Sequence, residues 1–316
     1  MAEYYQVDRH TIRDFCIKIN FDDSIYKKKK LTKQQIEYII ENYRSMSTKE
    51  IAEKIGVSKS AVGGVAHRYH LRSMKRKTYK LHNENYFHII DSQDKAYFLG
   101  FIGADGCLYD RGQGWQGMLS IIIQKEDIKI LEVLRNKLLT DKPINSYNKY
   151  ASLQISSDII FDDIEDKGLL PRKTYGNTIA NIPTIFMPAL IRGYFDGDGN
   201  ISFHKNILET KVSIAGYERN MLKLQQYFES KNIFTSFIAD NRKYNNAETG
   251  AFGNLYTLNK TSTYCLLKLL YKDTEGIYLD RKFDRAQLFL SAIEKSEQAR
   301  DKQIINYYKY AVQDLC

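Results

Sequence analysis

The sequence predicts a mixed α+β body made of two copies of one unit, preceded by a small all-α module. Three observations predict this fold class: a motif that occurs twice, strand and helix patterns that repeat after each copy, and three short helical periods near the N-terminus. The chain has 316 residues, enough for two or three domains with hydrophobic cores. Its 43% hydrophobic and 27% charged residues exclude a disordered or fibrous chain.

Positive charge is concentrated near the N-terminus. Residues 1–80 hold 18 of the 47 Lys and Arg but only 9 of the 38 Asp and Glu, which leaves 29 of each in the rest of the chain. A basic module joined to a balanced body is typical of an appendage that binds a polyanion, most often nucleic acid. On charge alone, a merely solvated basic face explains the pattern about as well.

Two classes of protein are excluded by the apolar residues and the cysteines. No apolar run approaches the roughly 20 residues that span a bilayer, and the first ten residues lack signal-peptide features, so we expect a cytoplasmic protein without a membrane partner. The four cysteines are far apart and predict neither a disulfide framework nor a zinc site. We expect reduced, mostly buried thiols at Cys16, Cys107, Cys265 and Cys316.

The spacing of apolar residues predicts three short helices over residues 31–73. Ser47 followed by Glu50 predicts a capping box, Gly56 a helix end, and Ser58 the cap of the third helix. The second and third helices have the spacing of a helix-turn-helix, in which the second helix enters the major groove of DNA. A module for protein contact is the alternative. The DNA-binding interpretation places four residues near bases or phosphates: Lys59, Ser60, His67 and Arg68.

Two further features belong to this basic region. Gly63 and Gly64 weaken the third helix by about 1 kcal/mol each, which indicates either close backbone approach or folding on DNA. Residues 2–21 match residues 52–71 at a constant offset, so the chain begins inside a partial helix-turn-helix-like copy. The lysine run between the copies suits phosphate contact or serves as a solvated linker: Lys27, Lys28, Lys29 and Lys30.

The body contains a duplication. FLGFIGADG at 98–106 matches IRGYFDGDG at 191–199 without a gap, and the register continues downstream. Each copy predicts a helix ending at Asp-Gly, two strands, an amphipathic helix, and then further strand and helix. The predicted organisation is therefore a partial copy with a basic linker, a helix-turn-helix module, and two repeats of the body: 1–30, 31–80, 81–182 and 183–316.

The two motif copies each end in an aspartate, Asp105 and Asp198. Small residues one turn apart in each predicted helix let the two helix backbones approach closely. The aspartates then lie at helix C-termini, where the helix dipole disfavours an anion, so the pair needs a cation. Paired carboxylates can hold a divalent metal with open positions for water and phosphate. A helix-stopping turn explains one Asp-Gly copy, but poorly explains two in register.

The two motif segments resemble the signature helices of single-chain LAGLIDADG homing endonucleases, and the similarity runs from about residue 97 to 292. The resemblance implies two αββαββα repeats whose antiparallel sheets form a saddle over DNA, with Mg²⁺ or Mn²⁺ bound at Asp105 and Asp198. It leaves open whether the backbone at Ala104 adds a metal ligand. The first copy has Gly103 where an earlier motif acid is usual, and the second keeps Asp196.

Each repeat also ends in a basic tract, LLPRKT at 169–174 and YLDRKFDRAQLFL at 278–290. By resemblance, Lys282 matches the family's basic residue near the active site, and Lys173 is its counterpart. Either would orient water or stabilise charge on the reacting phosphate; a simple phosphate contact is at least as good an explanation. Gln124 and Asp127 weakly match a region that supplies polar groups near the metal. Residues 241–254 suit a hairpin loop over DNA or a surface loop.

The residues and the resemblance together predict a site-specific endonuclease that cuts both strands of DNA. We expect a monomer that binds a long asymmetric target in double-stranded DNA and derives from a phage, bacterial or organellar genetic element. One alternative is a sequence-specific regulator that keeps the scaffold without cleavage, which the intact acids argue against. Another is a maturase that uses the same surface on intron RNA.

Overall fold

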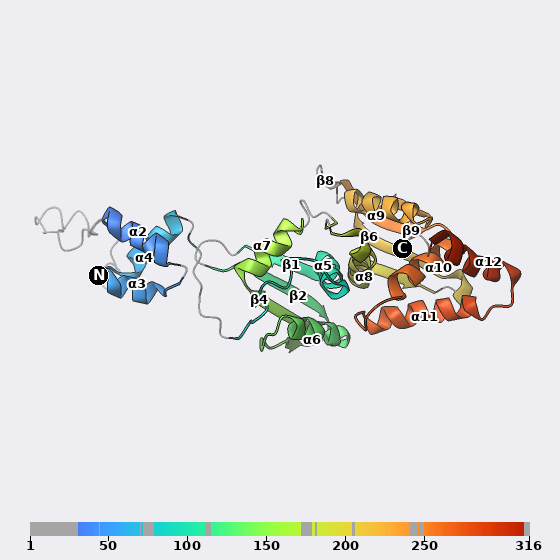
Figure 1. Ribbon diagram of the computed structural model, residues 1–316, viewed down its shortest axis with the longest axis horizontal. Helices are drawn as coiled ribbons and strands as arrows, with labels where there is room; N and C mark the ends of the chain where they lie inside the picture. The colour runs from blue at the N-terminus through green and yellow to red at the C-terminus, as the bar shows by residue number, and fades with distance from the viewer. Residues whose placement is uncertain are drawn as a thin grey trace, which may run out of the picture. The chain divides into compact units, whose positions relative to one another are not determined.

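The computed structural model describes most of the chain as two compact units, Met1–Ser73 and Met74–Cys316 (Figure 1). The partial copy and its lysine run lie outside the described residues, as do Lys173, Cys16 and Cys316. In the described part of the chain, no helix is long and apolar enough to cross a membrane. The described residues are 31–43, 45–69, 71, 79–110, 115–171, 179–180, 182–203, 206–240, 245–246 and 250–312.

The N-terminal unit contains the three predicted helices, α2 Lys33–Asn42, α3 Thr48–Lys54 and α4 Lys59–Arg68. Its predicted caps are present: the Ser47 hydroxyl accepts from the Glu50 amide, and the Glu50 carboxylate accepts from the Ser47 amide. The Ser58 hydroxyl accepts from Ala61, and Gly56 has a φ of +68°. The helices enclose a small core of their own: Ile39, Tyr43, Ile51, Ala52, Val62, Val65 and Ala66.

The body confirms the α+β class and consists of two αββαββα repeats followed by further helices (Figure 1). The first repeat contains α5 Gln93–Asp105, β1 Gly106–Tyr109, β2 Met118–Gln124, α6 Ile128–Lys137, β3 Asn145–Tyr147, β4 Tyr150–Ser156 and α7 Asp158–Asp166. The second contains α8 Met187–Asp198, β5 Gly199–Ser202, β6 Lys211–Tyr217, α9 Glu218–Ser230, β7 Thr235–Ala239, β8 Asn245–Asn246, β9 Gly250–Thr257 and α10 Lys260–Tyr271. The chain continues through α11 Asp280–Glu294, α12 Ala299–Tyr307 and a π-helical turn, Tyr308–Val312.

The two sheets have corresponding strand orders and registers. The first is antiparallel in the order β1-β2-β4-β3, and the second in the order β5-β6-β9-β7, with β8 paired to β9. Gly106 pairs with Ile121 in the first sheet and Gly199 with Ile214 in the second, at matching positions of the two copies. The stretch expected to be a loop, 241–254, ends inside β9, which begins at Gly250. The duplication in the sequence is thus a duplication of structure.

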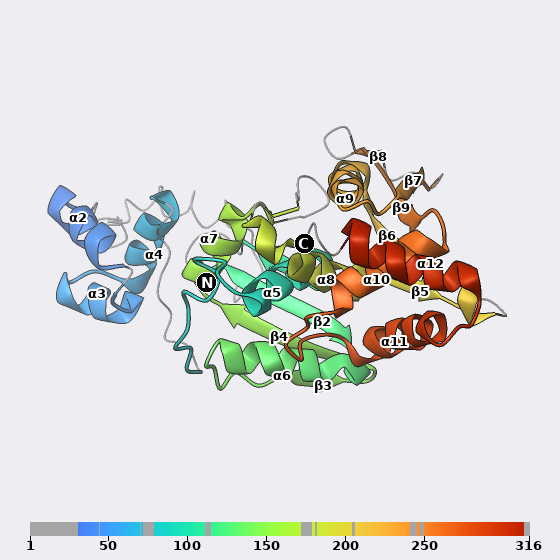
Figure 2. The ribbon, with the colours of Figure 1, turned by 45° about the vertical axis from the view of Figure 1, so that its right-hand side comes forward.

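Helices α5 and α8 lie side by side and join the two repeats (Figures 1 and 2). A Cβ built on Gly100 would lie 1.9 Å from the carbonyl oxygen of Leu190, and one built on Gly193 would lie 1.9 Å from that of Tyr97. The predicted close approach of the helices is therefore correct at both glycines. Gly103 differs, since a Cβ there would make ordinary contacts of 3.5 Å. One hydrophobic core continues across both repeats.

We expect Gly100→Ala to lower the free energy of unfolding of the body by about 3 kcal/mol or more. The added methyl group would clash with the backbone carbonyl of Leu190, and a backbone group cannot rotate away as a side chain can. Gly103→Ala, one turn further along α5, is the matched control and should leave stability unchanged or raise it by about 1 kcal/mol. Chemical denaturation of both variants measures the difference. Equal stability of the two variants would show that α5 and α8 do not touch through their backbones.

Candidate active site

The two motif aspartates are the last residues of α5 and α8, and a strand begins directly after each. The contacts of the glycines show that the two helices run in the same direction, so Asp105 and Asp198 lie at the same end of the helix pair. A Cβ built on Gly197 would lie 3.1 Å from the Asp105 Oδ2. The Asp105 carboxylate of α5 therefore lies against α8 at Gly197, the residue before Asp198.

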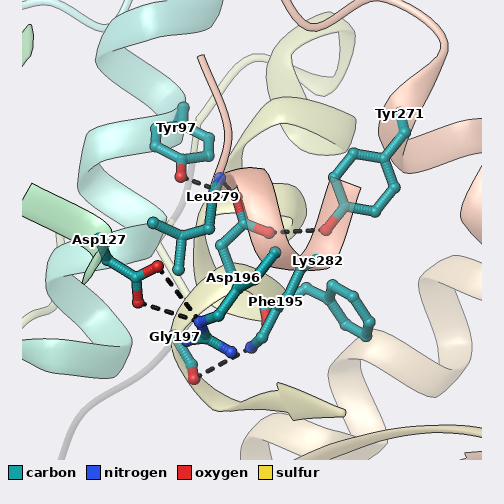
Figure 3. A network of polar contacts seen from close by, with 9 residues as sticks. Tyr97, Asp127, Phe195, Asp196, Gly197, Tyr271, Leu279 and Lys282 are labelled. Atoms are coloured by element: carbon teal, nitrogen blue, oxygen red, sulfur yellow. Dashed lines mark hydrogen bonds and ion pairs between the residues drawn. The ribbon is translucent and has the colours of Figure 1, made fainter. Parts of the chain in front are cut away.

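Lys282, in the first turn of α11, reaches the same helix end (Figure 3). Its Nζ donates to the carbonyl oxygens of Phe195 at 2.7 Å and Gly197 at 3.2 Å, and the side chain is only 4% exposed. Burial lowers the pKa of this ammonium to about 8, even though the charges of Asp196, Asp105 and Asp198 act to raise it. The structure thus places one buried cation beside both motif acids, at the negative ends of the helix dipoles.

Asp196, the earlier acid of the second motif, is fully buried and holds the chain that precedes α11 (Figure 3). Its carboxylate accepts from the hydroxyls of Tyr271 at 2.6 Å and Tyr97 at 2.8 Å, and from the backbone N–H of Leu279 at 2.9 Å. Burial raises the pKa of Asp196, whereas these hydrogen bonds act to lower it. All of these partners are protein groups, so we assign Asp196 a structural contact rather than a metal ligand.

Arg192 lies one turn before Asp196 on α8 and is equally buried. Its guanidinium donates to backbone carbonyls at the end of α10 and in the connection to α11, and it stacks over the Tyr97 ring at 5.4 Å. The four carbonyls belong to Leu270, Asp273, Thr274 and Ile277. The arginine therefore fixes the path of the chain toward α11.

The start of α11 is also tied to the first repeat. Arg281 Nε donates to both carboxylate oxygens of Asp127, at 3.0 and 3.2 Å, and Asp127 is buried at the end of the 3-10 turn that follows β2. Lys129 forms an ion pair with Asp280 alongside it. The structure thus brings the predicted residue Asp127 next to the basic tract that carries Lys282. Gln124, the other residue proposed there, is exposed at the end of β2.

The donor atoms at this helix end fit a hard divalent cation. Mg²⁺ is usually held by one or two carboxylates and completes its shell with water and substrate phosphates. Asp105 and Asp198 supply two carboxylates. Among the residues that the structure describes, no group of three or more His, Cys, Asp or Glu is arranged so that it could hold a metal ion. A metal here would accordingly have a sparse protein shell with positions left for water and phosphate.

The residues proposed for DNA contact in the N-terminal unit, Lys59, Ser60, His67 and Arg68, are all exposed on α4. At helical spacing, Gly63 lies between Lys59 and His67, and Gly64 lies between Ser60 and Arg68. A Cβ at either glycine would meet nothing within 4 Å. Close packing against the described residues of the N-terminal unit is therefore not the reason for the two glycines.

Sequence reasoning missed Arg192, Arg281 and the tyrosines Tyr97 and Tyr271, and it gave Asp196 no role. A usable signal exists in the duplication itself. Where the second motif has Arg192 and Asp196, four residues apart, the first has Leu99 and Gly103. Charged residues on a helix that is otherwise buried require partners.

No protein-family model matches the sequence, and no curated protein matches it. Among solved structures, the chain is similar to the meganuclease I-SmaMI bound to uncleaveable DNA, with 15% identity over 69% of this chain and 98% of that one and a TM-score of 0.46. It is also similar to the LAGLIDADG homing endonuclease I-GzeII in complex with its DNA target, with 12% identity over 68% and 96% and a TM-score of 0.45. A third similar structure is I-SmaMI bound to an uncleaved DNA target in the presence of calcium ions, with 16% identity over 68% of this chain and 97% of that one and a TM-score of 0.41.

Replacing Lys282 should change the pH dependence of stability. The folded-state pKa of about 8 lies below the value of 10.5 for the unfolded chain, so the cost of burying the charge is fully present below pH 8 and disappears as the pH rises toward 10.5. Relative to Lys282→Met, the wild type should gain about 3 kcal/mol across this interval. Denaturation in EDTA without DNA measures this difference.

Lys129→Met is the matched control, because Lys129 is exposed and its hydrogen bond with Asp280 raises its pKa. The stability difference between this variant and the wild type should stay flat between pH 7 and pH 10. If the stability difference between Lys282→Met and the wild type were also independent of pH, Lys282 would not be a buried, charged residue.

Proposed function

We propose that this protein is a site-specific endonuclease that hydrolyses phosphodiester bonds in both strands of DNA at the ends of α5 and α8. One observation carries the proposal: two parallel, directly packed helices end in Asp105 and Asp198, with the buried cation Lys282 beside both. The motif that forms these helices occurs twice and resembles the LAGLIDADG signature. The two motif copies, each ending in one aspartate, are related by a pseudo-twofold, which suits the two strands of a duplex.

Asp105 and Asp198 would hold Mg²⁺ or Mn²⁺, whose chemistry is to lower the pKa of bound water and to neutralise charge on the phosphate. The residues of the chain itself fix the relative positions of the two carboxylates and of Lys282. The backbone contact of α5 with α8 fixes the spacing of the two carboxylates. Lys282 brings positive charge to the place where negative charge accumulates on a reacting phosphate. We propose Lys173 as its counterpart in the first repeat.

The exposed faces of the two sheets would read the DNA sequence, because uncharged polar side chains recognise base edges by hydrogen bonding. In the first sheet, Ser152 and Gln154 of β4 lie on the face opposite the buried Leu153 and Ile155. In the second, Asn254 of β9 is opposite the buried Leu255. The faces carry different side chains, so the target should be asymmetric although the scaffold is pseudosymmetric.

The N-terminal unit would contact DNA that flanks the central site, through the exposed residues of α4 and the lysine run at residues 27–30. Such contacts add affinity and register, and phosphate contacts make binding depend on salt. One chain contains both repeats, so we propose that it acts as a monomer. Its origin in a mobile genetic element, and the maturase alternative on intron RNA, stay predictions.

Asp105→Asn and Asp198→Asn should each abolish double-strand cleavage while leaving specific binding nearly intact, because neither carboxylate is assigned to base reading. The substrate is the site mapped for the wild type in a randomised DNA library with Mg²⁺, and cleavage and gel-shift assays separate the two effects. Asp166→Asn, an exposed acid at the end of α7, is the control for charge. A wild type that binds one sequence and never cuts it would support the regulator, and a motif variant with normal cleavage would contradict the assignment.

A chain trimmed to begin at Tyr79 should bind DNA more weakly and with a shallower salt dependence, yet cut the same central sequence at low salt. Each phosphate contact that is removed reduces the slope of log K against log salt by about 0.9. The trimmed chain keeps Tyr79 and Lys80, which contact Ser156 and Asp141 in the body. Salt-dependent binding and footprinting measure the change. Loss of cleavage specificity in a folded, trimmed chain would assign sequence reading to the N-terminal unit.

A further inference from the structure

The two copies of the motif differ at two positions that lie one helical turn apart. The second copy has Arg192 and Asp196, which are 1% and 0% exposed, where the first has Leu99 and Gly103. Charged groups so deeply buried are costly unless all their partners are in place, and removing one partner destabilises the rest. The contacts of Arg192 and Asp196 show what these two charges hold.

Both charges act on the segment that leads to Lys282. Asp196 accepts from the backbone N–H of Leu279, and Leu279 is the N-cap of α11. The Lys282 N–H donates to the Leu279 carbonyl at 3.0 Å, so Lys282 is fixed one turn after this anchor. The Lys282 Nζ then returns to Phe195 and Gly197, the residues on either side of Asp196. The contacts thus form a closed loop that runs from Asp196 to Leu279, on to Lys282, and back to the neighbours of Asp196 (Figure 3).

Arg192 stabilises the same loop from the other side. It donates to carbonyls from Leu270 to Ile277, which end α10 and approach α11. Tyr271, at the end of α10, donates to Asp196 in turn. The position of Lys282 therefore depends on two side chains of α8 that lie within the motif itself.

The first repeat cannot build this anchor at the corresponding positions. Gly103 has no side chain in place of Asp196. Asn220 stands in place of Asp127, and its Oδ1 accepts from the Ile179 backbone. Gly103, Asp198 and Asn220 line a cavity of about 130 Å³ on that side of the helix pair. The surroundings on the two sides of the helix pair are thus chemically different.

We propose that Arg192 and Asp196 are positioning residues that hold Lys282 for the cleavage of one DNA strand in particular. The inference rests on the proposed function. A lysine that lies off the pseudo-twofold axis is closer to one of two symmetry-related phosphates, so its position matters for one cut more than for the other. Loss of the anchor should therefore make the cleavage rates of the two strands unequal.

The test compares Asp196→Asn with the wild type on a supercoiled plasmid that carries one mapped target site, with Mg²⁺ and with each strand end-labelled in turn. Asn keeps the size of Asp, but its amide N–H₂ cannot accept from the donors around it. We expect the cleavage of one strand to slow by about tenfold or more, the other strand to be cut at the wild-type rate, and nicked circles to accumulate. Tyr271→Phe removes one hydrogen bond to Asp196 and should give the same bias to a smaller extent.

Asp301→Asn is the matched control, because Asp301 is also 0% exposed and is bonded to Lys260 on α10, away from Lys282. It should lower stability without changing the ratio of the two strand rates. Combined with Lys282→Ala, Asp196→Asn should add little further slowing, since both changes remove one effect. Equal slowing of both strands, or fully additive effects with Lys282→Ala, would overturn the positioning role. A wild type that cuts neither strand would instead overturn the proposed function.

Discussion

The direct backbone contact between α5 and α8 is the constraint on which the rest of the body depends. Gly100 and Gly193 face the carbonyls of Leu190 and Tyr97 without space for a methyl group. This contact fixes the separation of the two repeats and therefore the relative positions of Asp105 and Asp198. Because the contact is made by backbone, side-chain rotation can hardly change it, and two carboxylates would need such a fixed spacing to share an ion.

The buried charges around Lys282 show how the second repeat completes the site. A buried ion or ion pair seldom adds net stability, because loss of hydration offsets the attraction. Arg192, Asp196 and Lys282 nevertheless each make several hydrogen bonds, mainly to backbone groups, and Arg281 connects the start of α11 to Asp127 of the first repeat. Their effect is to specify a single conformation for the start of α11. Burial of the surrounding apolar core offsets the free-energy cost of holding the start of α11 in this conformation.

Much of this architecture could be predicted from the sequence, because it depends on local patterns. Capping residues such as Ser47 lie within one turn of their partners, and the glycines and aspartates recur in both motif copies. The environment of Lys282 could not be predicted in the same way. Arg192 binds carbonyls about 80 residues away in sequence, and Arg281 binds an acid in the other repeat. The Arg192 contacts leave no periodic signal, since backbone carbonyls are present at every residue, and the Arg281 contact joins two single residues that are 154 positions apart.

Pseudosymmetry explains which residues are shared between the repeats and which differ. Residues that meet across the helix pair, such as Gly100 and Gly193, act on the same contact and must stay alike. Gly103 and Asp196 occupy corresponding positions but differ, because Asp196 also accepts from Leu279 in the segment that leads to Lys282. One polypeptide that contains both halves has no need to make them equal, whereas a dimer of identical chains must. The positions at which the two copies differ therefore indicate where the two halves of the proposed site have different functions.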